Sequence, residues 1–399
     1  MSQDLPPSPF PYPALEDWLR AKVLPFWASE GFDSASGAFV EKLDLSARPS
    51  EEDYTRVRVQ ARQIYVYAHA QTLGLFPEGL VLARSAYDFL IDNAWDIEEA
   101  GWFHRLSRKG SPLDRRKDCY DHAFMLLAMA WLYRATGAPQ VLDRARQTMA
   151  YLDRAMAVER EGAFDGYADY VVPADEPAPL PRRQNPHMHL FEALLALYEA
   201  SGERGWLDRA GRILDLFRRR FFSPQSGQLT EFFDNDWHET PVEGVFVREP
   251  GHHFEWVWLL HRYGVLAGED AVLPIMQKLF AWGWRHGIDR RESGAFGAYD
   301  EVDPAGQVLK GGSKRLWPQT EALKACLALW ERSGDRTAAA GIDPLLQSMF
   351  TDFVSFDHAL WQDQLDGAGK VIAPGIPASS LYHLFLAIAE TLRVAPNRP

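Results

Sequence analysis

The sequence predicts an all-α chain folded as an (α/α)6 barrel, in which six helical hairpins are joined by loops with short β-hairpins. Two observations predict this class. A short signature ending in glycine recurs at the end of apolar helical segments, and a second helical segment follows the signature. The recurrence has a period near 65 residues, which divides the 399 residues into about six units. A regular internal repeat of this kind is typical of folds built from one supersecondary unit.

The signature marks the end of the first helix in a unit. Its glycines are separated by 63, 65, 62 and 70 residues, and its copies are Ala70–Gly74, Tyr133–Gly137, Tyr198–Gly202, His261–Gly264 and Trp330–Gly334. Glycine is favoured just after a helix because it adopts positive φ without strain. Each copy therefore predicts a helix C-terminus.

The second helix of a unit is amphipathic, with apolar residues at steps of three and four. This spacing predicts helices over 141–155, 206–220 and 272–286. Glycine beside apolar or aromatic residues then predicts short strands or hairpins. These stretches are Gly37–Phe39, Gly101–Phe103, Gly162–Phe164, Gly227–Leu229, Gly294–Phe296 and, more loosely, Leu360–Leu365.

Six hairpins can close into a ring. An open helical solenoid is the alternative, but the polar capping repeats that a solenoid needs are not evident in the sequence. We therefore expect residues 1–399 to form a single barrel domain. The proline-rich stretch 173–181 is then a long loop inside a repeat, not a linker between domains.

Composition excludes several classes of protein. Lys and Arg number 42 and Asp and Glu 55, so the net charge of −13 argues against binding to nucleic acids or anionic membranes. Two cysteines, Cys119 and Cys326, exclude a disulfide framework and a cysteine-rich zinc module. The first 13 residues do not resemble a secretion signal, and no apolar run is long enough to span a membrane. We expect a cytoplasmic monomer or homodimer.

Polar residues recur at the start of each first helix, just ahead of an apolar run. The segments are 60–65, 120–124, 187–192, 251–256, 317–321 and 381–385. In a closed ring they would line one pocket rich in Arg, His, Glu, Tyr and Trp. Glu192 follows His189, and Glu255 follows His252, by three residues, so each pair shares a helix face.

Histidine in an apolar helix is more often a hydrogen-bonded core residue than a catalytic one, but four of the six units repeat one here. His122 fits the repeat and is expected to lie behind the pocket. Histidines outside the repeat are expected to be structural or on the surface: His69, His104, His238, His261, His286 and His358.

Neither a metal nor a cofactor is expected. His187 and His189 are two residues apart, and such side chains point away from each other on a helix. The glycine-rich nucleotide motifs and the serine-hydrolase elbow do not occur.

Five segments in order resemble the N-acylglucosamine 2-epimerase superfamily: RVQARQIY, NPHMHLFEAL, PGHHFEWVWLL, RLWPQTEALKA and SSLYHLFLA. The resemblance extends from about residue 12 to 390 and implies the (α/α)6 barrel. It also implies proton transfer by two histidines, His252 and His383, with Glu255 as a partner. By the same resemblance Arg62, Asn185 and His189 bind sugar oxygens, and Tyr120, Trp317 and Glu321 line the substrate.

The chemistry is consistent with the residue types. Histidine suits abstraction of a proton α to a carbonyl, an arginine can stabilise an enediolate, and tryptophan can stack on a sugar. We expect an isomerase that converts a free monosaccharide, D-mannose, to D-fructose through a cis-enediolate after ring opening. A sugar 2-epimerase is the alternative.

The sequence is also compatible with two other functional classes. An inverting glycoside hydrolase would need two carboxylates about 6.5–9.5 Å apart, drawn from Asp118, Asp121, Glu192, Glu255 and Glu321. A sugar-binding protein without activity is the other.

Overall fold

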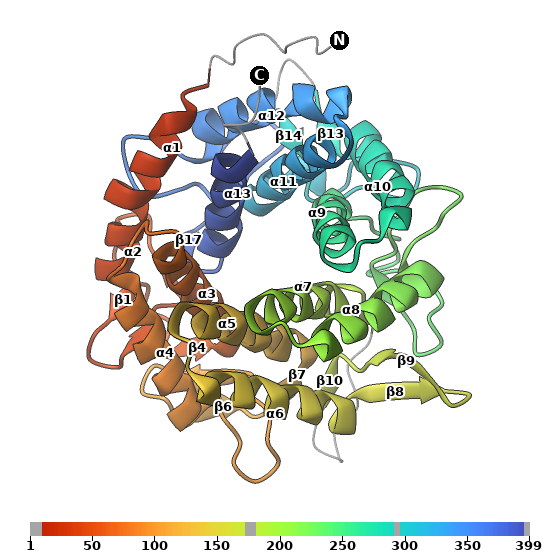
Figure 1. Cartoon of the computed structure of the whole chain (residues 1–399). Coiled ribbons are helices and arrows are strands. Elements are labelled where there is room, and N and C mark those ends of the chain that lie inside the picture. Colours follow the sequence, from red (N-terminus) through yellow and green to blue (C-terminus); the bar gives the residue numbers. More distant parts are fainter. Residues whose placement is uncertain (1–9, 172–180, 291–295, 395–399) are drawn as a thin grey trace. The chain divides into compact units, whose positions relative to one another are not determined.

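The computed structural model describes residues 10–171, 181–290 and 296–394. These residues fall into two compact units, drawn in Figure 1. Unit 1 takes its residues from 1–27, 224–229 and 248–399, and unit 2 from 28–223 and 230–247. The predicted loop over 173–181 lies almost entirely outside the described residues, as do Gly294 and Ala295 of the fifth predicted hairpin.

Unit 2 consists of three helical hairpins, each with a buried inner helix followed by an amphipathic outer helix. The inner helices pack side by side with α5 in the middle, and each outer helix packs on its own inner helix. The pairs are α3 (Val57–Thr72) with α4 (Gly79–Asn93), α5 (Cys119–Thr136) with α6 (Pro139–Ala155), and α7 (Asn185–Ser201) with α8 (Arg204–Leu216).

Unit 1 contains two hairpins of the same kind and a third pair that joins distant parts of the chain. The hairpins are α9 (Pro250–Ala267) with α10 (Leu273–His286) and α11 (Leu316–Ser333) with α12 (Arg336–Ser348). The last inner helix, α13 (Ser380–Val394), packs against α11 and against α1 (Tyr12–Trp18) near the N-terminus.

The N-terminal segment is fixed to this unit by two tryptophans. The Trp18 indole N–H donates to the carbonyl of His358 at 2.9 Å, and the Trp27 ring stacks on Trp361 at 4.8 Å between centroids. The sixth outer helix therefore comes from the start of the chain, and α2 (Leu24–Ser29) continues from it. The repeat pattern did not predict this pair.

The predicted helix ends are confirmed in four of the five glycine signatures. Gly74 has a φ of 69° and follows α3 by one residue, Leu73. Gly137, Gly202 and Gly334 directly follow α5, α7 and α11 with φ of 65°, 72° and 65°. The prediction at Gly264 is wrong, because α9 continues to Ala267 and Gly268 takes the positive φ of 68°. A Cβ atom on Gly264 would lie 2.8 Å from Val272 Cγ2, so close packing explains this glycine.

The predicted second helices are confirmed to within a few residues. Residues 141–155 fall in α6, 272–286 match α10, and 206–220 begin in α8 and end in a π-helical turn, Phe217–Phe221. The buried side chains of α8 repeat at steps of three and four, as expected for an outer helix.

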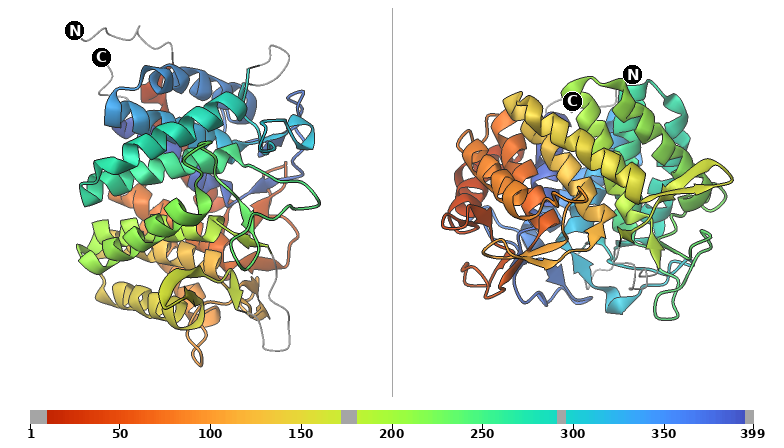
Figure 2. Two further views of the ribbon diagram at one scale, coloured as in Figure 1. Left: turned by 90° about the vertical axis from the view of Figure 1, so that its right-hand side faces the viewer. Right: turned by 90° about the horizontal axis from the view of Figure 1, so that it is seen from below.

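Short strands precede the inner helices and lie, in each unit, at one end of the helices (Figure 2). In unit 2 they are β1 (Phe32–Asp33), β2 (Ala38–Phe39), β3 (Lys42–Leu43), β4 (Tyr54–Arg56), β5 (Arg105–Ser107), β6 (Pro112–Asp114), β7 (Lys117–Asp118), β8 (Ala157–Arg160), β9 (Ala163–Tyr167), β10 (Tyr170–Val171), β11 (Arg182–Arg183) and β12 (Phe232–Phe233). In unit 1 they are β13 (Ile288–Asp289), β14 (Gly297–Ala298), β15 (Lys314–Arg315), β16 (Gln364–Leu365) and β17 (Ile376–Pro377).

These strands form small antiparallel ladders. In unit 2 the pairs are β1 with β2, β4 with β5 and β6, β7 with β10, β8 with β9, and β11 with β12. In unit 1, β13 pairs with β14 and β15 with β16. The prediction of short β-hairpins in the loops is confirmed. The stretches at Gly101–Phe103 and Gly227–Leu229 form no strand, and each contributes only an isolated bridge residue, Trp102 and Leu229.

A recurring side chain ties these loops to the inner helices. Near the start of each of the inner helices α3, α5, α7, α9 and α11, one His or Gln accepts a hydrogen bond from a backbone N–H 20 to 24 residues earlier. We call these side chains anchors. They are Gln60 (from Phe39, 2.8 Å), His122 (Trp102, 3.0 Å), His187 (Tyr167, 2.9 Å), His253 (Leu229, 2.9 Å) and Gln319 (Ala298, 2.6 Å).

The histidine anchors must be neutral to do this. Nε2 accepts the bond, so Nδ1 carries the proton and donates to a carbonyl one turn earlier, as from His122 to Asp118 at 2.8 Å. Burial lowers the pKa of His122 to about 4 and that of His187 to about 3. These buried imidazoles tie the loops to the inner helices, and His122 is one of them.

This burial predicts a pH dependence of stability. In the unfolded chain His187 takes up a proton below about pH 6.5, whereas in the folded protein its imidazole takes one up only near pH 3. The free energy of unfolding therefore decreases as the pH falls from about 6.5 to about 3. His187→Gln keeps an anchor of the kind seen at Gln60 but removes this proton. Between pH 4 and pH 6 the unfolding free energy of the variant should depend on pH less steeply, by about 1.4 kcal/mol per pH unit. Urea titrations at several pH values measure the slope, and equal slopes would contradict the assignment.

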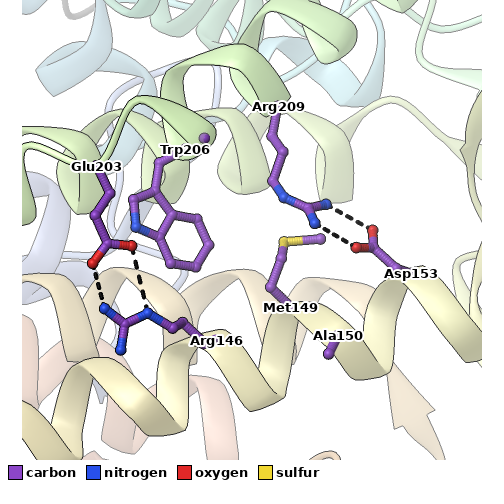
Figure 3. A pocket seen from close by; sticks show the side chains of 8 residues that line it. Arg146, Met149, Ala150, Asp153, Glu203, Trp206 and Arg209 are labelled. Atoms are coloured by element: carbon purple, nitrogen blue, oxygen red, sulfur yellow. Dashed lines mark hydrogen bonds and ion pairs between the residues drawn. The ribbon is translucent and has the colours of Figure 1, made fainter.

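One cavity lies on the outer helices of unit 2, between α6 and α8 (Figure 3). It has a volume of about 230 Å³ and is bordered by two ion pairs, Arg146 with Glu203 and Arg209 with Asp153. None of the predicted site residues lines it. In the part of the chain that the structure describes, every helix is too short or too polar to cross a membrane.

Candidate active site

The anchors define equivalent positions along the inner helices. Two residues after an anchor come Arg62, Phe124 and His189 in unit 2, and Glu255 and Glu321 in unit 1. Four of these five are predicted site residues. Within each unit these side chains come together.

In unit 1, five predicted residues form a group that we call the histidine cluster: His252, Glu255, Trp317, Glu321 and His383. They come from α9, α11 and α13, close to the N-terminal ends of the helices. All except Trp317 are buried. The half-buried Trp317 therefore gives the cluster its accessible aromatic surface.

His383 is oriented by a carboxylate. Its Nδ1 lies 2.8 Å from Glu321 Oε1, and Glu321 is completely buried. A carboxylate accepts hydrogen bonds, so Nδ1 carries the proton and Nε2 is left as the atom that can exchange one. Glu321 also forms an ion pair with Lys324, with Oε2 and Nζ 2.7 Å apart.

Trp317 lies beside both histidines of the cluster. Its ring centroid is 5.1 Å from that of His252 and 5.6 Å from that of His383. Glycine at position 251 permits this, because a Cβ atom there would lie 2.5 Å from Cη2 of Trp317. The two imidazoles and the indole therefore present one aromatic surface with two proton-transfer groups.

Two more carboxylates lie near these histidines. Glu255, Glu321 and His383 each offer a ligand-type atom within 4.8 Å of the other two. Glu249 Oε1 lies 3.8 Å from His252 Nδ1. The set could hold a cation, but the Lys324 ammonium already pairs with Glu321. Histidine side chains near carboxylates are chemically able to exchange protons.

In unit 2, four predicted residues and Phe124 form a second group, the arginine cluster: Arg62, Tyr120, Phe124, His189 and Glu192. Arg62 donates to the Tyr120 hydroxyl at 2.8 Å and lies 4.2 Å above the Phe124 ring. His189 Nδ1 lies 3.2 Å from Glu192 Oε2, the pair that the spacing predicts. A guanidinium, a phenol and an oriented imidazole suit the binding of sugar hydroxyl groups. Asn185 is the first residue of α7.

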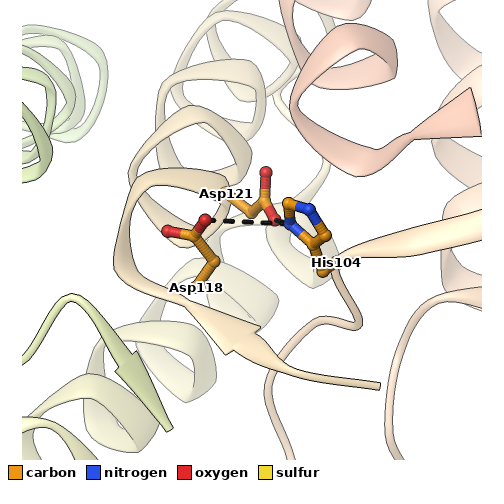
Figure 4. Close-up of side chains that lie close together, drawn as sticks. All are labelled: His104, Asp118 and Asp121. Atoms are coloured by element: carbon orange, nitrogen blue, oxygen red, sulfur yellow. Dashed lines mark hydrogen bonds and ion pairs between the residues drawn. The ribbon is translucent and has the colours of Figure 1, made fainter. Parts of the chain in front are cut away.

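A buried acidic pair lies at the start of α5, next to Tyr120 (Figure 4). Asp121 pairs with His104 at 2.6 Å and with Arg58 at 3.2 Å, and Asp118 caps the helix by accepting from the Tyr120 N–H at 2.8 Å. Burial and the charge of Asp121 raise the pKa of Asp118 to about 7. Burial acts to raise the pKa of Asp121 as well, but Arg58 and His104 more than offset it and lower that pKa.

The structure brings most of the predicted site residues together within each unit, next to partners that sequence reasoning did not single out. His104 was expected to be structural or on the surface, and it belongs to the acidic pair beside Tyr120. Lys324 was not singled out, although it stands three residues after Glu321 on one helix face. The roles assigned to the ten predicted site residues stay predictions.

Comparison with known proteins supplies the family. The model of the N-acylglucosamine 2-epimerase (GlcNAc 2-epimerase) family matches residues 37–387. A mannose-6-phosphate isomerase of Rhizobium meliloti (strain 1021) is 34% identical over 394 residues, covering 94% of this chain and 95% of the relative. A D-mannose isomerase of Thermobifida fusca is 31% identical, covering 81% and 80%.

Solved structures agree with the sequence comparison. A crystal structure of D-mannose isomerase matches with a TM-score of 0.85 at 21% identity, over 96% of this chain and 97% of that one. The predicted fold class, the all-α (α/α)6 barrel with short strands in its loops, is confirmed by this likeness. The relatives are named isomerases and the family is named for an epimerase, so the protein is an enzyme of the sugar isomerase and epimerase kind. On these grounds the chain belongs to the N-acylglucosamine 2-epimerase family.

Proposed function

We propose that the protein is an aldose–ketose isomerase that converts free D-mannose to D-fructose by proton transfer at His252 and His383. The observation that carries the proposal is the histidine cluster. Two imidazoles lie beside one half-buried indole, and one of them is oriented by a buried carboxylate. An apolar face of a sugar can stack on Trp317 while the histidines reach its reacting carbons.

The proposed reaction begins with ring opening, which exposes the C1 aldehyde. His383 Nε2 takes the proton from C2, and the electron pair of that bond forms the cis-enediolate. After this proton has exchanged with solvent, the imidazole delivers a proton to C1, the O2 hydroxyl loses its proton, and O1 gains one, so the aldose becomes a ketose with no net change in composition. His252 moves the proton between O1 and O2. If His252 instead delivered a proton to the opposite face of C2, the product would be the 2-epimer.

Two observations support a mannose substrate, and the second of them favours its uncharged form. The two relatives named above are isomerases of mannose or its 6-phosphate. In unit 1, Arg315 lies 5.4 Å from the Trp317 ring and pairs with Asp300 at 3.1 Å, and the buried Lys314 one residue before it pairs with Asp289 at 2.8 Å. Their charge is therefore already balanced, which favours a neutral sugar over a phosphorylated one. We further propose that the arginine cluster and Asn185 bind sugar oxygens.

The test is product analysis by NMR in D2O, with mannose and mannose 6-phosphate supplied in separate reactions. Fructose labelled with deuterium at C1 is expected from mannose, with much slower turnover of the phosphate. Glucose without fructose would show an epimerase, and a higher kcat/KM for mannose 6-phosphate would overturn the proposed substrate while leaving the isomerase intact.

A further inference from the structure

Lys324 is a fully buried cation directly behind the histidine cluster. We propose that Lys324 is a positioning residue for the proton transfer at His383, because it holds Glu321 in the carboxylate form that orients the imidazole. This inference rests on the proposed role of His383. It adds a residue that does not itself touch the substrate.

The geometry places Glu321 between two partners. Its Oε1 lies 2.8 Å from His383 Nδ1, and its Oε2 lies 2.7 Å from Lys324 Nζ. The side chains of Glu321 and Lys324 are both 0% exposed. Each of the two carboxylate oxygens therefore has its own positively polarised neighbour.

Burial makes the pairing necessary. A carboxyl group out of water favours its neutral form, and so does an amine, unless an opposite charge lies nearby. Together, Glu321 and Lys324 keep each other charged. A protonated Glu321 could donate to the imidazole instead of accepting the hydrogen bond from the His383 Nδ1–H. The imidazole would then lose the bond that keeps its proton on Nδ1 and leaves Nε2 free to take a proton from the substrate.

The neighbours of Lys324 hold its ammonium in place. Nζ lies 4.4 Å from the centroid of the Trp258 ring on α9, a cation–π contact. The Trp258 indole N–H donates in turn to Glu390 Oε2 on α13 at 2.9 Å, and Glu390 pairs with Arg393. The three inner helices of unit 1 thus each contribute to fixing this one charge.

The charge balance predicts an effect on catalysis. Within unit 1, the titratable groups near His383 include Glu255 on α9, Glu321 and Lys324 on α11, and Tyr382 on α13. Without the Lys324 charge, the coupled Glu321–His383 pair takes up a proton at a higher pH than in the wild-type enzyme. This holds whether the proton is on the carboxylate or on the imidazole. A protonated pair cannot act as a base, so the acidic limb of the kcat/KM profile should move to higher pH.

The experiment measures kcat/KM between pH 5 and pH 9 for three variants of the full chain. Lys324→Met removes the charge and keeps much of the stem, Lys324→Arg keeps the charge, and His383→Asn tests the proposed function itself. For Lys324→Met we expect the acidic midpoint to rise by about one pH unit, with a loss of up to about tenfold at pH values below both midpoints that recovers in alkali. Lys324→Arg should keep the wild-type midpoint even if kcat falls.

The outcomes separate the two proposals. If His383→Asn is inactive while Lys324→Met keeps the wild-type midpoint and kcat/KM, the role of Lys324 is overturned and the function stands. If His383→Asn is fully active, the proposed function fails. A downward shift in Lys324→Met also overturns the inference.

Two measurements cover the case in which Lys324→Met does not fold, as judged by circular dichroism. Lys324→Gln can still donate to Glu321 but carries no charge, and the same upward shift is expected. In the wild-type enzyme, NMR of labelled histidine should show His383 protonated at Nδ1. The Nε2–H tautomer would contradict an ionised, accepting Glu321.

Discussion

Replacing His252 by Gln is expected to lower kcat/KM for mannose by about 10²- to 10⁴-fold, the usual cost of losing a general acid or base. The same replacement at the next residue, His253→Gln, should change it by no more than about threefold. The difference follows from position. His252 lies beside Trp317 in the histidine cluster, whereas His253 is an anchor that accepts from the Leu229 N–H.

Steady-state kinetics on the two variants measures this contrast between neighbouring histidines. Glutamine serves as the anchor at Gln60 and Gln319, which is why it suits position 253. Equal thermal midpoints would show that both variants fold. A His252→Gln enzyme with full activity would refute the two-histidine mechanism, and an inactive, folded His253→Gln enzyme would refute the assignment of the anchor.

Gly251→Ala should reduce kcat/KM by about 10- to 100-fold, because small displacements of positioned groups are costly to catalysis. The new Cβ would lie 2.5 Å from Cη2 of Trp317 and 3.2 Å from Cβ of Pro318, so the indole must move. That movement disturbs the surface shared with His252 and His383.

A double-mutant cycle identifies the cause of the loss. Trp317→Phe removes the indole atoms that the new methyl group meets, so Gly251→Ala should have little further effect in that background. Gly205→Ala is the matched control, since a Cβ on Gly205 meets nothing within 4 Å. If Gly251→Ala were as damaging in the Trp317→Phe background as in the wild-type enzyme, the clash would not be the reason.

The repeat was visible in the sequence because its marks are local. A glycine after a helix reports its own backbone conformation, and Gly137, Gly202 and Gly334 end helices as predicted. Gly264 misled the same reasoning because its small size serves contact with Val272, which lies outside the helix. The presence of a glycine does not by itself show whether the position requires a positive φ or a close packing contact.

The anchors could have been found by the same local logic. A His or Gln recurs 20 to 24 residues after the Gly-containing strand or loop that it ties to the helix. With that register, His252 separates from His253, and Arg62, His189, Glu255 and Glu321 fall at one equivalent position. The spacing between each anchor and its Gly-containing segment is thus present in the sequence. The repeat of glycines and apolar residues alone does not reveal this spacing.

By itself the sequence determined the helical repeat, the family and the identity of the polar residues at the helix starts, because each depends on neighbours along the chain. Only the tertiary structure decided which partners those residues have. The pairing of α1 with α13, the bond from His383 to Glu321, 62 positions away, and the close approach of Trp317 to Gly251 all join distant segments. The proposed effect of Lys324 on Glu321 depends on the burial of its ammonium group between α9, α11 and α13. Burial by three separate helices cannot be predicted from a pattern of neighbouring residues.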